Sequence, residues 1–415
     1  FHFGLKQFDG SPKLLYRTWI KEGIAGIKNL AEYGGGAQSR DSEVKSSKPK
    51  FNIAGGFKSK IEKEHVLITG GAGFIGCNLA ERLLSEGKRV MIYDNLSRAG
   101  VEENLLWLRE RHGDNLLIRV ADVRNQYALK EAVMNAESVF HFAAQVAVTT
   151  SIENPVNDFE INVNGTLNVL EALRLLNKKI PFVYTSTNKV YGALSGINFE
   201  NDGTKYYPLN ETFRRYGISE SQPLDFHSPY GCSKGAADQY VKDYARIYGI
   251  PTVVFRMSCI YGRRQFGTED QGWVAHFIIR ILNGDPITIY GDGKQVRDIL
   301  FIDDLVNAFL LALNNIDKVK GKSFNIGGGP GNSISVMEAL NIIQELNDGY
   351  LPPVSFSSWR QGDQVYYVSD TREFYKAAGW KPNISVEEGI AALYKWLYEN
   401  RANVMDVIKL KKAAL

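Results

Sequence analysis

Short apolar runs alternate with amphipathic stretches along this chain from His65 onward. A parallel strand buried on both faces is almost continuously apolar, whereas a helix that covers a sheet repeats its apolar residues every three or four positions. The alternation predicts strands at 65–69, 89–93, 116–120, 138–142, 181–186 and 252–256, with helices at 74–86, 101–111, 125–135, 159–176 and 228–248 between them. This order is typical of an α/β fold in which helices cover both faces of a parallel sheet.

The pattern becomes less regular after about residue 257. Helical patterns at 271–283, 302–314, 335–346 and 385–399 are mixed with short strand candidates such as ITIY and SFNIG. With 415 residues, the chain is also longer than one hydrophobic core usually serves. We therefore expect a sheet domain over 63–257, a smaller α+β domain over 258–402 with some segments that return to the first, and a C-terminal tail over 403–415.

Residues 1–62 differ from both of these regions. Their second half is rich in Gly, Ser and Lys, which indicates a linker. Their first half has apolar side chains near helical spacing, namely Leu14, Leu15, Trp19, Ile20, Ile24, Ile27 and Leu30. Two interpretations stay open for this stretch: a short helix docked on its own protein, or a helix that binds a membrane surface or a partner.

Composition and charge exclude several classes of function. Residues 1–63 carry 12 Lys and Arg against 6 Asp and Glu, whereas the remainder carries 37 against 40. The main body is therefore close to neutral, which argues against a nucleic-acid-binding surface there. The sequence has no transmembrane stretch and no signal-peptide pattern, so we expect a cytoplasmic protein. The three cysteines and six histidines lack the spacing of a metal site, and we expect no bound metal.

Three glycines, Gly70, Gly73 and Gly76, lie between the first predicted strand and the first predicted helix. This spacing permits a tight turn, close approach of the backbone to a pyrophosphate and an anion at the helix N-terminus. Asp94 ends the second strand, where a carboxylate accepts hydrogen bonds from ribose hydroxyls and repels a phosphate. The sequence thus predicts a Rossmann-type, doubly wound domain that binds NAD. Arg98 lies close enough to keep NADP as an alternative.

Residues that follow the other strands are expected to complete the dinucleotide site. Asp122 and Val123 would flank the adenine, although Asp122 is equally a candidate helix cap. Ala143, Ala144 and Gln145 follow the fourth strand, and Thr185 ends the fifth. The predicted cofactor-binding set is Gly70, Gly73, Phe74, Ile75, Gly76, Asp94, Asn95, Ser97, Asp122, Val123, Ala143, Ala144, Gln145, Thr185, Tyr230 and Lys234.

The segment 228–234 carries the candidate chemistry. Ser228 and Pro229 predict a helix start, and Tyr230 and Lys234 then share one helical face. A tyrosine with a pKa near about 10 is a poor base at neutral pH, but a neighbouring ammonium and a nicotinamide cation favour the phenolate. Tyr230 would take the proton of a substrate hydroxyl while the carbon gives hydride to NAD. Thr187, at the end of the fifth strand, would bind the same oxygen, which makes Thr187, Tyr230 and Lys234 the predicted catalytic residues.

The segments TGGAGFIG, STNKVYG and SPYGCSK, together with Asp94, resemble the extended short-chain dehydrogenase/reductase family of nucleotide-sugar enzymes over about residues 64–400. The resemblance implies a tightly held NAD, reduced and reoxidised within one turnover, and a homo-oligomer. Longer matches around Gln145 and Gln271 imply an isomerase that inverts C-2 of a CDP-linked dideoxyhexose through a 2-keto intermediate. A UDP-hexose 4-epimerase is the alternative, because the same catalytic residues serve either carbon.

The resemblance also bears on the substrate. The 4,6-dehydratases of the family carry Asp-Glu directly after the catalytic Thr, where this chain has Asn188 and Lys189, so dehydration is disfavoured. Thr187, Gln271, Arg297 and Arg360 are expected to bind substrate, the arginines at the diphosphate, unless each arginine belongs to a surface ion pair. The loop 192–225, with Tyr206 and Tyr207, is expected to shape the sugar pocket. The intact Thr187, Tyr230 and Lys234 argue against a non-catalytic dinucleotide sensor.

Overall fold

The computed structural model describes residues 64–98, 100–360 and 362–414. The amphipathic stretch and the linker predicted within 1–62 lie outside the described residues. None of the helices in the described ranges combines the length and the apolar composition needed to cross a membrane.

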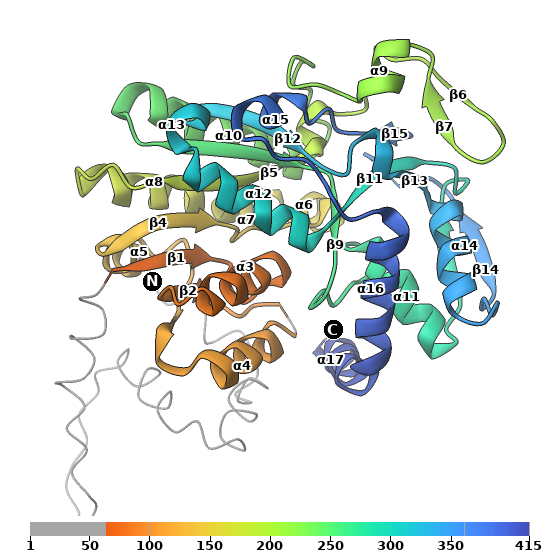
Figure 1. Ribbon diagram of the computed structural model, residues 1–415, viewed down its shortest axis with the longest axis horizontal. Coiled ribbons are helices and arrows are strands. Elements are labelled where there is room, and N and C mark those ends of the chain that lie inside the picture. The colour runs from red at the N-terminus through yellow and green to blue at the C-terminus, as the bar shows by residue number, and fades with distance from the viewer. Residues whose placement is uncertain (1–63, 99, 361, 415) are drawn as a thin grey trace, which may run out of the picture. The chain divides into compact units, whose positions relative to one another are not determined.

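Seven parallel strands form the central sheet (Figure 1), in the spatial order β12-β8-β5-β4-β1-β2-β3. Their bounds are β1 His65–Thr69, β2 Val90–Asp94, β3 Leu116–Val120, β4 Ala136–His141, β5 Phe182–Thr187, β8 Thr252–Met257 and β12 Lys322–Ile326. The strand order changes direction at β1, which is the topology of a doubly wound sheet. The predicted Rossmann-type α/β class is therefore confirmed.

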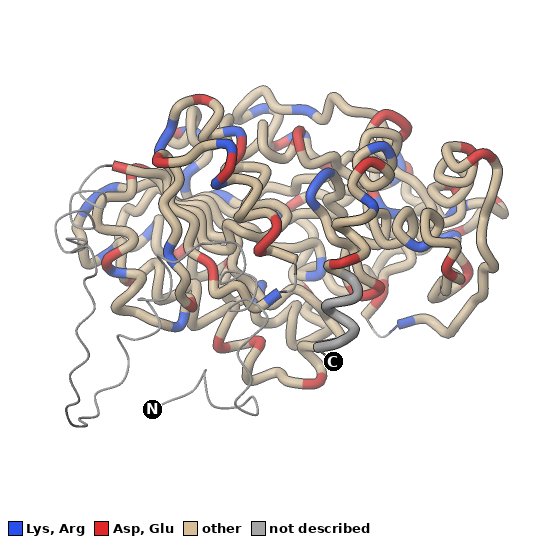
Figure 2. The backbone as a smooth tube through the Cα atoms, turned by 90° about the horizontal axis from the view of Figure 1, so that it is seen from below, with Lys and Arg blue, Asp and Glu red and all other residues tan. Residues whose placement is uncertain are grey.

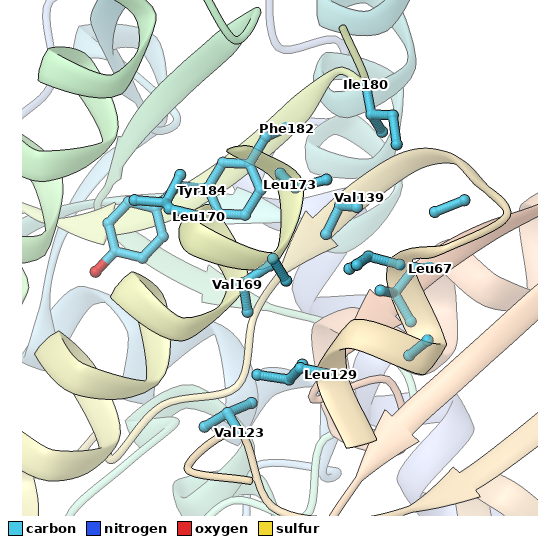
Figure 3. Packing of buried hydrophobic residues seen from close by; sticks show 14 of the residues in the cluster. Leu67, Val123, Leu129, Val139, Val169, Leu170, Leu173, Ile180, Phe182 and Tyr184 are labelled. Carbon is cyan, nitrogen blue, oxygen red and sulfur yellow. The ribbon is translucent and has the colours of Figure 1, made fainter. Parts of the chain in front are cut away.

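Helices cover both faces of this sheet because alternate residues of each strand point to opposite sides. On one face, a buried apolar cluster joins the strands to α5 Gln126–Val133, α8 Gly165–Leu175 and α10 Pro229–Tyr248. Figure 3 shows this packing, with Val139 and Phe182 among the labelled residues. On the other face Phe140 and Phe255 contact Phe309 of α12 Ile302–Asn314. Helix α12 packs against α3 Phe74–Ser85, which in turn packs against α4 Val101–His112.

The helix predicted over 159–176 is interrupted. After α6 Val148–Glu153, the chain forms α7 Pro155–Phe159, then a π-helical segment Glu160–Asn164, and only then α8. Asn162, within this segment, exchanges hydrogen bonds of 2.9 and 3.1 Å with the backbone of Gln145. Apolar periodicity predicts where a helix runs but contains no signal for such a widened turn.

Segments beyond residue 257 build a second group of sheets and helices. One sheet joins β9 Cys259–Tyr261, β11 Val296–Phe301, β13 Ser333–Ser335 and β15 Tyr366–Tyr367, and another pairs β10 Ile287–Tyr290 with β14 Val354–Ser357. The helices here are α11 Trp273–Asn283, α14 Val336–Leu346 and α16 Val386–Glu399, whereas α12 and β12 pack with the first sheet. The boundaries predicted for the two domains stay a prediction.

The other elements before the C-terminal helix are short. The loop 192–225 contains β6 Phe199–Asn201, β7 Tyr206–Pro208 and α9 Glu211–Tyr216, and α13 Ile316–Val319 and α15 Arg372–Ala378 lie further on. Short 3₁₀ turns occupy Gly113–Asn115, Asn188–Tyr191 and Pro330–Asn332. Figure 2 shows basic and acidic positions interspersed along the described chain.

The segment predicted as a C-terminal tail, 403–415, overlaps a helix, α17 Arg401–Ala414. Val404 and Val407 of this helix are buried. Val407 lies against Gly100, whose backbone has φ +91°, and a Cβ added at Gly100 would be 2.6 Å from the Val407 side chain. The burial of Val404 and Val407, and the contact of Val407 with Gly100, therefore show that this helix packs on the rest of the described chain.

Candidate active site

A cavity of about 510 Å³ opens at the carboxyl ends of β1, β2, β4 and β5 and extends to β9, β10 and β11. Loops at this edge of a doubly wound sheet usually form its ligand site. The cavity is lined by the predicted residues Gly70, Gly73, Phe74, Ile75, Gly76, Asp94, Asn95, Ser97, Asp122, Val123, Ala143, Ala144, Thr185, Thr187, Tyr230, Lys234, Gln271, Arg297 and Arg360.

Two expected contributions to the cavity are not seen. Gln145 is not among the lining residues; its side-chain amide donates to the carbonyl of Ala147 at 2.8 Å. Ala144 and Val146 line the cavity on either side of it, so the alternation of the extended backbone turns Gln145 away. The loop 192–225 does not line the cavity either, and Tyr206 instead donates to Asp292 at 2.7 Å.

The glycine loop fits the pyrophosphate of a dinucleotide. Gly70 has φ +68°, and a Cβ at this residue would be 2.6 Å from the backbone nitrogen of Ala143. A Cβ at Gly76 would be 2.5 Å from the carbonyl oxygen of Gly70. Gly73 begins α3 without a side-chain cap, so the first N–H groups of the helix are left for an anion.

Carboxylates mark the adenosine end of the cavity. Asp94 accepts from the backbone nitrogens of Leu96 at 2.8 Å and Ala72 at 3.1 Å, and burial raises its pKa despite these hydrogen bonds. Burial alone would also raise the pKa of Asp122, but hydrogen bonds from Arg124 and Asn95 lower it to about 2. Asp122 does not cap α5, because Asn125 does so. Asp94 is thus bonded only to backbone N–H groups, whereas Asp122 is already paired with the Arg124 guanidinium and the Asn95 amide.

Arg98 also lines the cavity beside Asp94. Burial lowers the pKa of its guanidinium, and Asp94 opposes this shift. A carboxylate at the strand end favours ribose hydroxyls over a phosphate. These residues fit NAD.

The start of α10 is built as the sequence predicts. Ser228 accepts a hydrogen bond from the backbone nitrogen of Gly231 at 3.0 Å, and Pro229 occupies the first turn. Tyr230 is further fixed through its backbone nitrogen, which donates to the Ser151 hydroxyl at 3.1 Å. Thr187 ends β5 and accepts from the backbone nitrogen of Lys189 at 3.3 Å. Strand β5 and helix α10 thus bring the two hydroxyls of Thr187 and Tyr230 to one side of the cavity.

The pKa values of Tyr230 and Lys234 in the protein alone do not favour the phenolate. Burial raises the pKa of Tyr230 to about 12, a hydrogen bond with Thr187 opposes the rise, and the Asp158 carboxylate adds to it. Burial also lowers the pKa of Lys234 to about 7, against the attraction of Asp158 and Asp238. Burial therefore dominates the pKa of both groups, the protein alone holds Tyr230 as a neutral phenol, and the bound nicotinamide cation would be needed to favour the phenolate.

Lys234 lies in a nearly closed environment. It is 4% exposed, and its ammonium is 4.3 Å from the centre of the Tyr184 ring. His141, on the neighbouring strand β4, is hydrogen bonded to Thr69 at 2.6 Å and Thr166 at 3.0 Å. Burial, followed by repulsion from Lys234, lowers the pKa of His141 to about 3, so this imidazole is neutral.

Cations gather at the opposite end of the cavity. Arg297 donates to the carbonyl oxygens of Val296 at 2.7 Å and Gln364 at 2.6 Å. Arg360 donates to the carbonyl oxygen and the carboxylate of Glu269, both at 2.9 Å, and lies 3.8 Å from the centre of the Tyr290 ring. Arg360 is therefore in an ion pair and also lines the cavity.

Lys189 is a third cation at this end, and it is not among the site residues predicted from the sequence. Its ammonium donates to the carbonyl oxygen of Gly362 at 2.9 Å and lies 3.6 Å from Asp363. Burial, and then repulsion from Arg297, lowers its pKa to about 8. Its position two residues after Thr187, at the end of a strand, could have indicated that it lies in the site.

The end of β8 and the segment after it also line the cavity, although the sequence did not predict this. The residues are Met257, Ser258 and those of β9, Cys259 to Tyr261.

Comparisons with known proteins agree with this geometry. Residues 66–327 match the NAD dependent epimerase/dehydratase family. The chain is 45% identical to CDP-paratose 2-epimerase of Salmonella typhi, over 80% of this chain and 98% of that protein. It resembles the structure of UDP-glucose 4-epimerase of Thermotoga maritima with UDP-glucose, with a TM-score of 0.70 and 30% identity over 81% of this chain and 99% of that one. For UDP-glucose 4-epimerase of Thermus thermophilus in complex with NAD, the TM-score is 0.66 and the identity 32%, over 80% and 98% of the chains.

Proposed function

This chain belongs to the NAD dependent epimerase/dehydratase family, and from that premise we propose that it inverts C-2 of a CDP-linked dideoxyhexose, converting CDP-paratose to CDP-tyvelose. The protein is an isomerase, and its cofactor is NAD. The observation that carries the choice of substrate is the 45% identity to CDP-paratose 2-epimerase over 98% of its length. A match of this extent includes the loops at the sugar end as well as the glycine loop.

The residues of the chain have distinct tasks in this proposal. Bound NAD supplies a site that accepts a hydride and returns it. Tyr230 takes the proton of the C-2 hydroxyl in the first half of the reaction and gives it back in the second, as reversibility requires. Thr187 donates to the same oxygen and thereby fixes its position. Lys234 holds the nicotinamide ribose and, while protonated, opposes the raised pKa of Tyr230.

The substrate's diphosphate is assigned to the cationic end of the cavity. Arg297 and Arg360 present planar guanidinium groups that suit phosphate oxygens. Lys189 lines the same cavity, is repelled by Arg297 and follows Thr187 by two residues, and we assign it to the part of the substrate next to the diphosphate. C-2 neighbours the anomeric carbon that carries the diphosphate, so a cation close to Thr187 favours placing C-2 at the catalytic hydroxyls.

Dehydration lacks its usual residues here. Asn188 donates to the side chain of Gln364 at 2.9 Å, and Lys189 is a cation. Neither can act as the carboxylic acid or carboxylate that removes water from a hexose. The reaction therefore stops at the ketone and returns the hydride.

A UDP-hexose 4-epimerase is the second candidate. The observation that favours it is the structural similarity to UDP-glucose 4-epimerase, with a TM-score of 0.70. Inversion at C-4 would use the same Thr187, Tyr230 and Lys234, and only the placement of the sugar would differ.

The deciding experiment incubates the purified protein with CDP-paratose, CDP-glucose, UDP-glucose and UDP-galactose and follows the configuration of each sugar by NMR. We expect inversion at C-2 of CDP-paratose with no net change in NAD. No inversion at C-2 of either CDP-sugar, together with turnover at C-4 of a UDP-sugar, would overturn the proposal. The cytoplasmic location and the homo-oligomer inferred from the sequence stay predictions.

A further inference from the structure

Asp158, on α7, is a buried carboxylate that the proposed mechanism leaves without a task. It is 1% exposed. Its Oδ1 accepts a hydrogen bond from the Asn162 side chain at 3.1 Å, while its Oδ2 is buried and has no hydrogen-bond partner among the described residues. Burial raises the pKa of this carboxyl, and the nearby Ser233 hydroxyl and the Lys234 ammonium oppose the rise. An ionised group in such surroundings is costly and calls for a positive charge close by.

A comparison with Asp238 identifies which positive charge is available. Asp238 is fully buried on α10, but Arg256 binds both of its oxygens, at 2.8 and 3.1 Å. Asp238 also attracts Lys234, but its charge is compensated locally by Arg256, and it acts on Lys234 after Asp158. The hydrogen-bonding groups beside Asp158, the Asn162 amide and the Ser233 hydroxyl, are uncharged, so its charge acts on Lys234 and on whatever lies beside Lys234 in the cavity.

A nicotinamide ring bound beside Tyr230 and Lys234 is positively charged as NAD⁺ and neutral as NADH. A fixed negative charge nearby stabilises the cationic form and leaves the neutral form almost unaffected. We propose that Asp158 is a positioning residue whose charge makes the nicotinamide end of the cavity favour NAD⁺ over NADH. The inference rests on the proposed function only in requiring the nicotinamide to lie next to Lys234.

Such a bias suits an enzyme that must return its hydride in every turnover. If the site favoured NADH, loss of the ketone before the second half of the reaction would leave an inactive complex. A site that favours NAD⁺ returns the hydride sooner. Asp158 would therefore lower the frequency of abortive turnovers without touching the substrate.

The test measures the preference for the oxidised form directly and uses no sugar. The purified protein is equilibrated at pH 9 with a known mixture of NAD⁺ and NADH, free nucleotide is removed, and the bound nucleotides are quantified after denaturation. At pH 9 Lys234, with a pKa of about 7, is already neutral, so the loss of Asp158 does not also remove a proton from Lys234. We expect Asp158→Asn to lower the bound NAD⁺:NADH ratio by about tenfold.

Three other variants separate charge from packing. Asp158→Ser is a second uncharged variant and should also lower the ratio, whereas Asp158→Glu keeps the charge and should stay within about threefold of the unmodified protein. Asp304→Asn removes a buried carboxylate elsewhere, one that accepts from the backbone nitrogens of Asn383 and Ile384, and should leave the ratio unchanged. The inference would be overturned if Asp158→Asn and Asp158→Ser left the bound NAD⁺:NADH ratio unchanged. It would also be overturned if Asp158→Glu lowered the ratio as much as Asp158→Asn does. A wrong sugar assignment would leave this result intact.

Discussion

The two ends of the cavity hold their charged groups in different ways. At the cofactor end, Asp94 accepts from two backbone nitrogens, and Lys234 is buried against the Tyr184 ring. At the substrate end, Arg360 is paired with the exposed Glu269, and Lys189 with a carbonyl oxygen and Asp363. The charged groups at the cofactor end are therefore held by buried protein partners that a bound dinucleotide need not displace. The substrate end must exchange protein partners for phosphate oxygens, so its substitutions should affect binding more than chemistry.

The largest effect is expected from Tyr230→Phe, which removes the proton acceptor and keeps the ring. Turnover should fall by about a thousandfold while bound NAD stays unchanged. Turnover by NMR and NAD content after denaturation check this. The control is Tyr240→Phe, an exposed tyrosine on the same helix, which should stay fully active. A Tyr230→Phe protein with full activity would show that the chemistry does not reside at the cofactor end.

Gly76→Ala should disturb the cofactor end next most strongly. The new Cβ would lie 2.5 Å from the carbonyl oxygen of Gly70, so the loop must move away from the pyrophosphate. We expect an unfolding free energy lower by about 1–3 kcal/mol and a large loss of bound NAD. Thermal unfolding and nucleotide content test this against Gly196→Ala, where an added Cβ meets nothing within 4 Å. Normal NAD content in Gly76→Ala would contradict a tightly built cofactor end.

Lys189→Met tests the substrate end. It should weaken CDP binding about tenfold, the effect of one charge-assisted hydrogen bond, without lowering NAD content. In the unmodified protein, affinity for CDP should fall as the pH rises through about 8, because Lys189 then loses the charge that attracts phosphate. Calorimetry from pH 6.5 to 9.5 should show this decline, and Lys189→Met should lack it. The same pH profile in both proteins would exclude Lys189 from the anion site.

The smallest effect is expected from Glu269→Gln. Glu269 is half exposed, so its ion pair with Arg360 contributes less than about 1 kcal/mol. Loss of the carboxylate charge should release Arg360 for phosphate and strengthen CDP binding by about twofold to threefold. Weaker binding in this variant would show that Glu269 positions Arg360 for the ligand, and that the substrate end is as preformed as the cofactor end.

Much of the sheet could be predicted because its strands are buried on both faces and therefore stand out as apolar runs. The predicted helix 228–248 is found as Pro229–Tyr248, since its start is signalled by Ser228 and Pro229. The helix at the C-terminus could not be predicted. It packs on α16, and its Val407 contacts Gly100, a residue that only the folded chain brings close.

The candidate site likewise contains residues that could be predicted from local sequence and residues that could not. Residues that the glycine spacing and the strand ends specify, such as Gly70 and Asp94, do line the cavity. Gln145 does not, because a position after a strand says nothing about the direction of a side chain. Asp158 and Lys189 could not be predicted as site residues. Asp158 interacts with the charge of Lys234 on α10, and Lys189 with that of Arg297 on β11, and only tertiary packing brings these groups together. Sequence patterns thus predicted the backbone of the site better than its electrostatics.

The π-helical segment Glu160–Asn164 also constrains how this region can change in evolution. A π turn contains one residue more than an α turn. Deletion of a single residue here would close the segment into regular α-helix and rotate α7 by about 100° relative to α8. Asp158 would then leave the side of α10, while the core residues of α8 kept their places. A homologue one residue shorter at this point should therefore carry a different residue in the position of Asp158.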